Sequence, residues 1–338
     1  MNEVQSVGFR DSIDLTSLTM VFITRNRQDL VLKNSRIYQR LGATIVILDG
    51  SDSPIADNDQ GSFADRCTYI YSFECLERRL SLASKYVHTP FTIVSTDDDL
   101  LVPSALQKSM NFLLEHPKVL SCSGRTIGFI QSQSKLSLFV CYPEHDDSRN
   151  SLLPRSAMLR TIQYFRNYSS RYFYSVYRTE DWIPVYTDFV GERQLPRNYF
   201  ELIIEFRACL KGAHHILPDL FWLRNFTNAP IRVDEEYRVF AKPFDYIAIA
   251  REAFSNASKR VGRSFLGDVF KALLICLIIL ALDLKNALSA IKSKLHHLNP
   301  LRGNRLPEVE KNFELKVLLE AKNSDFNELE INELLRLV

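Results

Sequence analysis

Three consecutive aspartates follow the apolar run at residues 91–96: Asp97, Asp98 and Asp99. Adjacent carboxylates repel one another unless a cation or hydrogen-bond donors neutralise them. Clustered carboxylate oxygens favour Mg²⁺ or Mn²⁺, and such an ion usually keeps several waters and also binds substrate phosphates, so two or three carboxylates suffice. The segment therefore predicts a site for one of these cations. The alternative interpretation is a solvent-exposed acidic turn that precedes a helix.

Two earlier apolar runs also end in polar residues. The first ends at Thr24, which Arg25 and Asn26 follow, and the second ends at Asp49. Because ligands bind beyond the carboxyl ends of parallel strands, we expect these side chains to meet the aspartates around one pocket and to contact a nucleotide. Asp49 could accept hydrogen bonds from a nucleobase, and Thr24 could contact base or ribose. Alternatively, Asp49 only caps a turn and Thr24 is an ordinary strand residue.

The elements that must position these residues alternate between strand and helix patterns. LTMVFITRN is a β-branched and apolar run, RQDLVLKNSRIYQRLG has helical spacing, and ATIVILD is a second apolar run. This order is the unit of a parallel sheet covered by helices, and it continues to about residue 117. Further strands are predicted at 119–130, 136–142 and 213–225, a strand that runs into a turn at 173–182, and further helices at 154–168 and 199–212.

The helix pattern at residues 75–87 carries two adjacent arginines, Arg78 and Arg79. A guanidinium presents a fork of donors that matches phosphate oxygens. We therefore expect one of the two to pair with a diphosphate. The alternative is that both lie on a solvated face of the helix.

The order and spacing of these segments resemble those of GT-A nucleotide-sugar glycosyltransferases, particularly the family-2-like inverting enzymes of bacterial polysaccharide and glycan biosynthesis. The matching segments, within about residues 15–228, are VFITRN, ILDGSDS, the arginine-bearing helix, TIVSTDDDLLVP and FELIIEFRACLKG. The resemblance implies an α/β fold of GT-A (Rossmann-like) type, with a mostly parallel sheet flanked by helices, and the sequence beyond it predicts a helical C-terminal extension. It implies that Asp49 contacts the base, that Asp98 is the main metal ligand with Asp99 beside it, and that Asp97 lies at the donor.

The same resemblance suggests a general base. The family's later helix commonly carries an acid six residues before an arginine and eleven before a glycine, and Arg207 and Gly212 keep this spacing relative to Glu201. Glu201 is therefore the expected catalytic base that takes a proton from the acceptor hydroxyl. Phe200 replaces the usual preceding acid, and Glu205 on the same helix face is the reserve choice. The alternative for Glu201 is a structural salt bridge.

Two further groups have both functional and structural interpretations. His214 and His215 follow the helix, and since neighbouring strand residues point to opposite faces, at most one of them could reach the site. Arg178, Asp181 and Trp182 could shape an acceptor pocket, because tryptophan offers a flat apolar face to a sugar ring. Core packing is the alternative for Trp182.

Residues beyond about 255 differ in character from the expected catalytic domain at 15–255. The segment 256–300 is basic and contains eleven uncharged residues, Ala272–Leu282, whereas a membrane span needs about 20. It predicts an amphipathic helix that lies on an anionic membrane surface, or one that packs on the domain or on a second subunit in a homo-oligomer. The segment 301–338 is acidic with apolar residues at helical spacing, which predicts a packing or partner element.

The composition limits the function classes. The 338 residues are 46% hydrophobic and 24% charged with a net charge of +2, which is typical of a globular protein and gives no reason to expect a nucleic-acid partner. The six cysteines include no CxxC pair and are expected to be reduced thiols. The first 15 residues lack the apolar run of a signal peptide, so we expect a cytoplasmic protein that associates with the inner face of the cell membrane.

Together these expectations describe an inverting, metal-dependent glycosyltransferase. It would move a sugar from a nucleotide-sugar donor to a hydroxyl of a glycan or lipid-linked saccharide. One rival is a nucleotidyltransferase acting on a sugar phosphate, although such enzymes normally show a glycine-rich loop after the first strand and TRNRQDL has no glycine. The other rival is a noncatalytic scaffold of a polysaccharide assembly complex.

Overall fold

The computed structural model describes the greater part of the first 227 residues and a few residues beyond them. The described residues are 13–56, 66–132, 135–140, 151, 156–166, 170–187, 197–227, 277, 330–331 and 334–335. Except for Leu277, the predicted amphipathic segment 256–300 lies outside them, so its expected membrane and oligomer contacts stay predictions.

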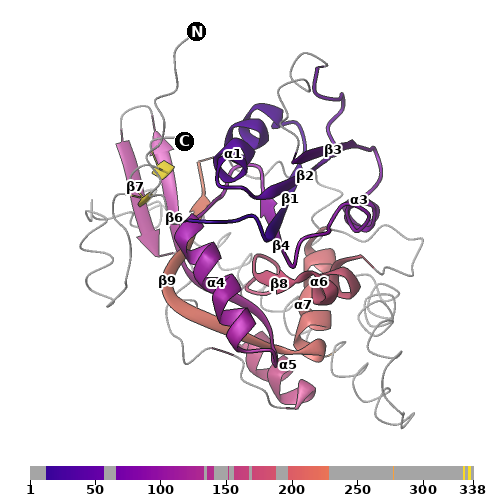
Figure 1. The fold of residues 1–338 in the computed structure, drawn as a ribbon, viewed down its shortest axis with the longest axis vertical. Coiled ribbons are helices and arrows are strands. Elements are labelled where there is room, and N and C mark those ends of the chain that lie inside the picture. Colours follow the sequence, from indigo (N-terminus) through magenta and orange to yellow (C-terminus); the bar gives the residue numbers. More distant parts are fainter. Residues whose placement is uncertain are drawn as a thin grey trace, which may run out of the picture.

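The first part of the chain alternates strands and helices as expected, and the later part adds a second group of strands (Figure 1). The strands are β1 Leu18–Thr24, β2 Thr44–Asp49, β3 Cys67–Tyr71, β4 Phe91–Thr96, β5 Leu100–Leu101, β6 Val119–Ser132, β7 Lys135–Val140, β8 Val176–Arg178 and β9 Ala213–Asn225. The helices are α1 Gln28–Arg40, α3 Leu76–Ala83, α4 Pro103–Glu115, α5 Ala157–Arg166, α6 Thr179–Tyr186 and α7 Arg197–Lys211.

In the described residues these strands form one sheet. Its order is β3-β2-β1-β4-β8-β6-β9-β5, and β7 pairs with β6 outside this path. The first four strands are parallel, β8 is antiparallel to both of its neighbours, and β6 and β9 are parallel to each other. The predicted α/β class is confirmed, and the sheet is mixed beyond β4.

Helices pack on this sheet and bury its apolar side chains. Helix α1 packs on β1 and β2, α4 packs on β6, β8 and β9, and α6 packs on β4 and β8. All seven residues of β1 are buried, as a strand covered on both faces requires. The three strand ends predicted to carry the site are therefore fixed by a rigid core.

One predicted element is wrong in part. The strand expected at 173–182 is limited to β8, and α6 begins at Thr179. Glu180 and Asp181 lie in the first turn of α6, where negative charge stabilises the helix N-terminus. Trp182 is fully buried and stacks on Tyr186 one turn later, with ring centroids 5.0 Å apart.

Residues from the end of the chain pack against the domain. Ile331, Leu334 and Leu335 are buried and belong to the main hydrophobic core. Glu330 accepts hydrogen bonds from the backbone N–H and the hydroxyl of Ser104, at 2.8 and 2.6 Å. Glu330 thus caps the first turn of α4, more than 200 residues earlier in the chain.

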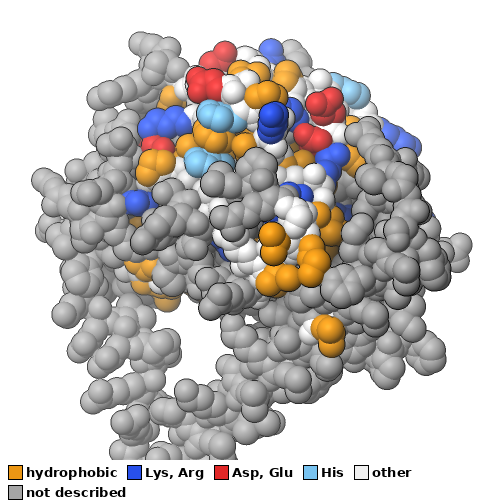
Figure 2. Space-filling model, turned by 90° about the horizontal axis from the view of Figure 1, so that it is seen from below, with side chains coloured by type: hydrophobic (Ala, Val, Ile, Leu, Met, Phe, Trp, Pro, Cys, Tyr) orange, Lys and Arg blue, Asp and Glu red, His pale blue; other side chains and the backbone are white. Residues whose placement is uncertain are grey.

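The surface of the described part mixes charged and apolar side chains (Figure 2). Helix α5, at the bottom of Figure 1, exposes the apolar side chains of Met158, Leu159 and Ile162, whereas Thr161 and Tyr164 are buried. Among the described residues, no helix has the length and apolar character needed to cross a bilayer.

Candidate active site

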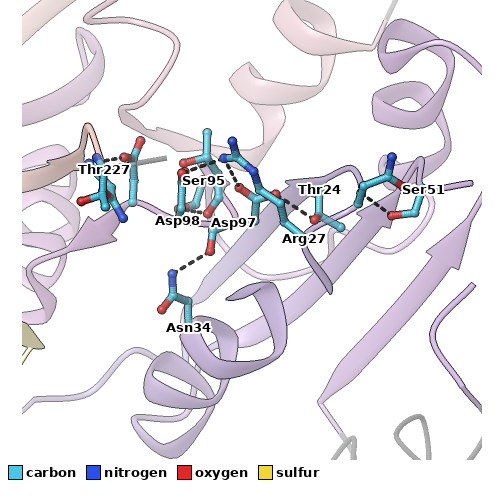
Figure 3. Close-up of polar contacts among 12 residues, drawn as sticks. Thr24, Arg27, Asn34, Ser51, Ser95, Asp97, Asp98 and Thr227 are labelled. Carbon is cyan, nitrogen blue, oxygen red and sulfur yellow. Dashed lines mark hydrogen bonds and ion pairs between the residues drawn. The ribbon is translucent and has the colours of Figure 1, made fainter. Parts of the chain in front are cut away.

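Three strand ends meet at one edge of the sheet. Thr24 pairs with Asp49 in the register of β1 and β2, and Ile23 pairs with Thr96 in that of β1 and β4. The Thr24 hydroxyl donates a 2.8 Å hydrogen bond to Oδ2 of Asp97 (Figure 3). The structure therefore brings together the side chains that the sequence predicted to gather.

All three aspartates of the segment after β4 are buried. Asp97, Asp98 and Asp99 are 6%, 9% and 5% exposed. Asp98 accepts a 2.7 Å hydrogen bond from Nη1 of Arg27, and Asp99 accepts a 2.8 Å bond from the backbone N–H of Asn225. The alternative of a solvent-exposed acidic turn is wrong, because each carboxylate lies within the protein and has a specific partner.

Helix α1 fixes the backbone of this segment. Asn34 donates from Nδ2 to the carbonyl of Asp97 at 2.7 Å. One turn further along α1, the Tyr38 hydroxyl accepts from the N–H of Leu101 at 2.7 Å and donates to its carbonyl at 2.9 Å. The aspartates are thus held from both ends by side chains of one helix.

Burial places these carboxylates under electrostatic strain. Burial and the charge of Asp98 raise the pKa of Asp97 to about 7, against the lowering effects of Thr24 and Arg27. Burial and Asp98 likewise raise the pKa of Asp99 to about 6, although the hydrogen bond from Asn225 lowers it. The internal donors therefore compensate only part of the negative charge.

A tight turn after β1 directs Arg27 toward the aspartates. Asn26 adopts a left-handed backbone conformation with φ 56°, which asparagine tolerates better than most residues. Its N–H donates to the Ser51 hydroxyl at 2.7 Å, and its side chain exchanges hydrogen bonds with Asp52 at 3.1 and 3.0 Å. Nη1 of Arg27 lies 2.7 Å from Asp98 and 3.6 Å from Asp97.

Asp49 lies at the centre of a hydrogen-bond network at the end of β2. The side chain is fully buried and accepts from Nε2 of Gln28, from the Tyr69 hydroxyl and from the Ser51 N–H and hydroxyl. The Gln28 and Tyr69 contacts are each 2.7 Å long. Sequence reasoning missed both partners, which come from α1 and β3.

The two arginines of α3 have different surroundings. Arg79 is buried and donates from Nη1 to the carbonyls of Thr24 and Leu48, at 3.3 and 3.1 Å. A Cβ added at Gly50 would lie 2.4 Å from its Cζ atom, so the glycine leaves room for the guanidinium. The side chain of Arg78 is 58% exposed and pairs with Glu74 at 3.7 Å, as on a solvated helix face.

The two candidate bases lie on α7. Glu201 is half-buried. Glu205 is fully buried and accepts from the Tyr164 hydroxyl and from the N–H groups of Tyr172 and Phe173. Burial raises the pKa of Glu205 to about 8 against these hydrogen bonds. Glu205 thus anchors residues 172–173 within the core, which leaves Glu201 as the candidate base.

The histidine pair packs within the fold. His214 is buried, and its ring nitrogens lie 2.9 and 3.0 Å from the hydroxyls of Ser121 and Ser123. His215 points to the other side, as strand alternation predicts, and stacks on Phe112 with ring centroids 4.2 Å apart. Both histidines therefore have structural contacts.

The residues proposed for an acceptor pocket also have structural partners. Arg178 donates to backbone carbonyls, including that of Val119 at 2.6 Å, and Asp181 pairs with Lys211 at 3.1 Å. The complete burial of Trp182 supports its core-packing interpretation.

The aspartates at the strand ends could supply some, but not all, of the ligands of a divalent cation. Within the described residues, no three His, Cys, Asp or Glu side chains form a ready-made metal cage. Mg²⁺ and Mn²⁺ sites that also bind substrate phosphates need only one or two carboxylates. The buried, incompletely neutralised oxygens of Asp97, Asp98 and Asp99 fit that requirement.

Comparisons with known proteins give distant structural similarity. No protein-family model matches the sequence, and no curated protein matches it either. The S. aureus TarS 1-349 structure in complex with UDP has a TM-score of 0.48 at 11% identity, covering 75% of this chain and 69% of that chain. The TarS 1-349 complex with UDP-GlcNAc has a TM-score of 0.46 at 13% identity, and the match covers 75% of this chain and 70% of that chain. TarS 1-349 has a TM-score of 0.46 at 12% identity, and the match covers 84% of this chain and 93% of that chain. Similarity at this level assigns neither a family nor an activity to the chain.

Proposed function

We propose that this protein is a metal-dependent glycosyltransferase of the GT-A type. It transfers a sugar from a nucleotide-sugar donor to a hydroxyl acceptor and releases the nucleotide. The observation that carries this proposal is the convergence of Thr24, Asp49 and the buried aspartates 97–99 at the carboxyl edge of parallel strands. Ligands of open α/β sheets bind at that edge.

The two ends of the site suit the two ends of a nucleoside diphosphate. Asp49, held by Gln28 and Tyr69, forms the polar end at which the nucleobase would bind. Arg27 and the aspartates form the charged end. Thr24 ends β1, the strand between β2 and β4, and Arg25 and Asn26 follow it, so the ribose would contact these residues.

Asp98 and Asp99 are the proposed ligands of Mn²⁺ or Mg²⁺, with Asp97 beside the donor. When bound, the cation would neutralise negative charge that develops on the leaving diphosphate. Asp97 holds its place through Thr24, and Asp99 through the backbone of Asn225. These contacts orient the carboxylates before any ligand arrives, which limits the reorganisation required on binding.

Glu201 is the proposed general base for direct displacement with inversion. A half-buried carboxylate at this position would accept the proton of the attacking hydroxyl. We further propose a glycan or lipid-linked saccharide as acceptor and a peripheral position on the inner face of the membrane. Support for these two points comes from the basic and apolar sequence of 256–300.

Donor hydrolysis tests the proposal. Purified protein with Mn²⁺ is incubated with a panel of nucleotide sugars, and nucleoside diphosphate release is measured for the wild type, Asp98→Asn and Asp99→Asn. We expect hydrolysis of one donor, reduced at least about 100-fold in both variants, since removing an electrostatic contact to the leaving group costs a factor of this size. Asp29→Asn, an exposed change of the same charge, serves as the control.

Two results would contradict the proposal. Equal turnover in the wild type and both variants would remove the metal site. Formation of pyrophosphate from a nucleoside triphosphate and a sugar phosphate, without any donor hydrolysis, would instead identify a nucleotidyltransferase.

A further inference from the structure

Arg27 contacts Asp97 and Asp98 at the charged end of the site, and the proposed catalytic mechanism gives these contacts no role. Its Nη1 atom lies 2.7 Å from Oδ2 of Asp98 and 3.6 Å from Oδ1 of Asp97 (Figure 3). The arginine side chain is 19% exposed, whereas those of the two aspartates are about half as exposed, at 10% and 9%. The Arg27 side chain is therefore the most exposed of the three groups in this cluster.

The charges in this cluster do not balance. Three neighbouring aspartates carry three formal negative charges, and Arg27 supplies one positive charge at contact distance. Arg224 contributes a second positive charge that acts on Asp99. The cluster therefore has a deficit of positive charge that Arg27 reduces without removing.

A divalent cation on Asp98 would compete with Arg27. Its bonds to carboxylate oxygens are about 2.0–2.1 Å long, so an ion bound to Oδ2 of Asp98 would lie within about 5 Å of Nη1 of Arg27 at its present position, 2.7 Å from that oxygen. Two cations at that separation repel each other strongly in a partly buried site. This repulsion favours a movement of Arg27 away from Asp98 when the ion binds.

The backbone of Arg27 is fixed by hydrogen bonds, whereas its side chain is 19% exposed. The Arg27 carbonyl accepts from the N–H groups of Leu30 and Val31, which ties the residue to the first turn of α1. The preceding turn is held by the Asn26 contacts to Ser51 and Asp52. A displacement of Arg27 would therefore be confined to its long side chain.

We propose that Arg27 is an internal counter-ion that exchanges partners when the site is loaded. Without a divalent cation it holds Asp97 and Asp98 in place. When the cation binds, Arg27 leaves Asp98 and its guanidinium pairs with the diphosphate of the donor, to which its fork of donors is matched. The inference rests on the proposed function and assigns Arg27 a role in binding the diphosphate of the donor.

A substitution of Arg27 that strengthens Mn²⁺ binding and weakens UDP binding would distinguish this exchange from a purely structural role. Mn²⁺ affinity is measured without nucleotide, from the electron paramagnetic resonance signal of free Mn²⁺, and UDP affinity is then measured by calorimetry with Mn²⁺ saturating. For Arg27→Gln we expect Mn²⁺ to bind at least about fivefold tighter, because the competing positive charge is gone. We expect UDP to bind at least about fivefold weaker, because the diphosphate loses its arginine partner. Arg27→Lys, which keeps the charge and loses the fork, should lie between. Arg40→Gln, the same charge change at the other end of α1, should match the wild type.

The possible outcomes separate this inference from the proposed function. If the wild type binds Mn²⁺ and UDP but Arg27→Gln binds Mn²⁺ no more tightly than the wild type, the inference is overturned and the proposed function stands. Failure of the wild type to bind any of UDP, GDP, ADP and CDP with Mn²⁺ would refute the proposed function and the exchange with it. Melting curves establish that each variant folds, and if Arg27→Gln does not fold, unchanged UDP affinity in Arg27→Lys overturns the inference, because this variant lacks the fork of donors.

Discussion

Replacing Asp99 with asparagine measures how strongly burial disfavours the ionised carboxylates of the site. Asparagine has nearly the same shape, and its Oδ1 atom can still accept the hydrogen bond from the N–H of Asn225, which is 2.8 Å long in the wild type. The substitution therefore removes the charge and keeps the contact. Any change in the pH dependence of stability then reports the titration of Asp99.

The expected sign follows from proton binding. The pKa of Asp99 is about 6 in the folded protein and 3.8 in its ordinary state, so the folded state holds the proton more tightly than the unfolded state. The resulting stabilisation is fully present below pH 3.8 and is lost as the pH rises through about 6. A difference of about two pKa units corresponds to a loss on the order of 3 kcal/mol in the free energy of unfolding.

Urea unfolding at pH 4, 5, 6, 7 and 8 in the presence of a chelator tests this magnitude. The free energy of unfolding of Asp99→Asn, relative to the wild type, should rise by about 3 kcal/mol between pH 4 and pH 7 and then level off. Asp29→Asn provides the control for the loss of one negative charge on an exposed residue. A difference between Asp99→Asn and the wild type that stays constant over this range would refute the reasoning.

Three other substitutions test contacts that support the site. Glu330→Ala removes the cap on Ser104 and should lower the free energy of unfolding by about 0.5–2 kcal/mol in urea; equal stability would mean that the tail contact does not hold in solution. Gly50→Ala brings a methyl group to 2.4 Å from Cζ of Arg79, so UDP affinity measured by calorimetry should fall at least about tenfold, and an unchanged affinity would contradict the role of that close approach. Glu205→Ala leaves buried N–H donors without an acceptor and should cost at least about 3 kcal/mol by thermal or urea unfolding, whereas a cost below about 1 kcal/mol would count against its anchoring role.

The parallel half of the fold could be predicted from sequence because its signals are local. β1, β2 and β4 are apolar runs bounded by turn residues, and each ends at a polar residue. In a parallel sheet those ends must share one edge, so the proximity of Thr24, Asp49 and the aspartates followed from the order of elements.

The contacts that define the site depend on pairings distant in sequence. Asp49 meets Tyr69 because β2 and β3 are neighbours, and Asp99 meets Asn225 because β5 pairs with β9. β5 has only two residues, which is too short to give a periodic pattern. Arg27 reaches Asp98 because Asn26 adopts a left-handed turn, and the sequence gives no local sign of the pairing.

The end of β8 shows how a local pattern misled the prediction. FYSVYRTEDW has the aromatic and β-branched composition of a strand, yet residues from Thr179 onward are helical. Two factors outweigh the strand propensity of this segment. Acidic residues lie in the first turn of α6, and Trp182 is buried against Tyr186.

Calorimetric titration of nucleoside diphosphates tests the central claim most directly, namely that one edge of the sheet binds an activated diphosphate together with a divalent cation. UDP, GDP, ADP and CDP are titrated into the wild type and into Asp98→Asn, each with Mn²⁺ and with a chelator. The account predicts that one nucleotide binds to the wild type only with Mn²⁺ and that Asp98→Asn weakens this binding at least about tenfold, since a charge-assisted contact of this kind contributes more than about 1.4 kcal/mol. Binding of equal strength with the chelator and in Asp98→Asn would contradict it.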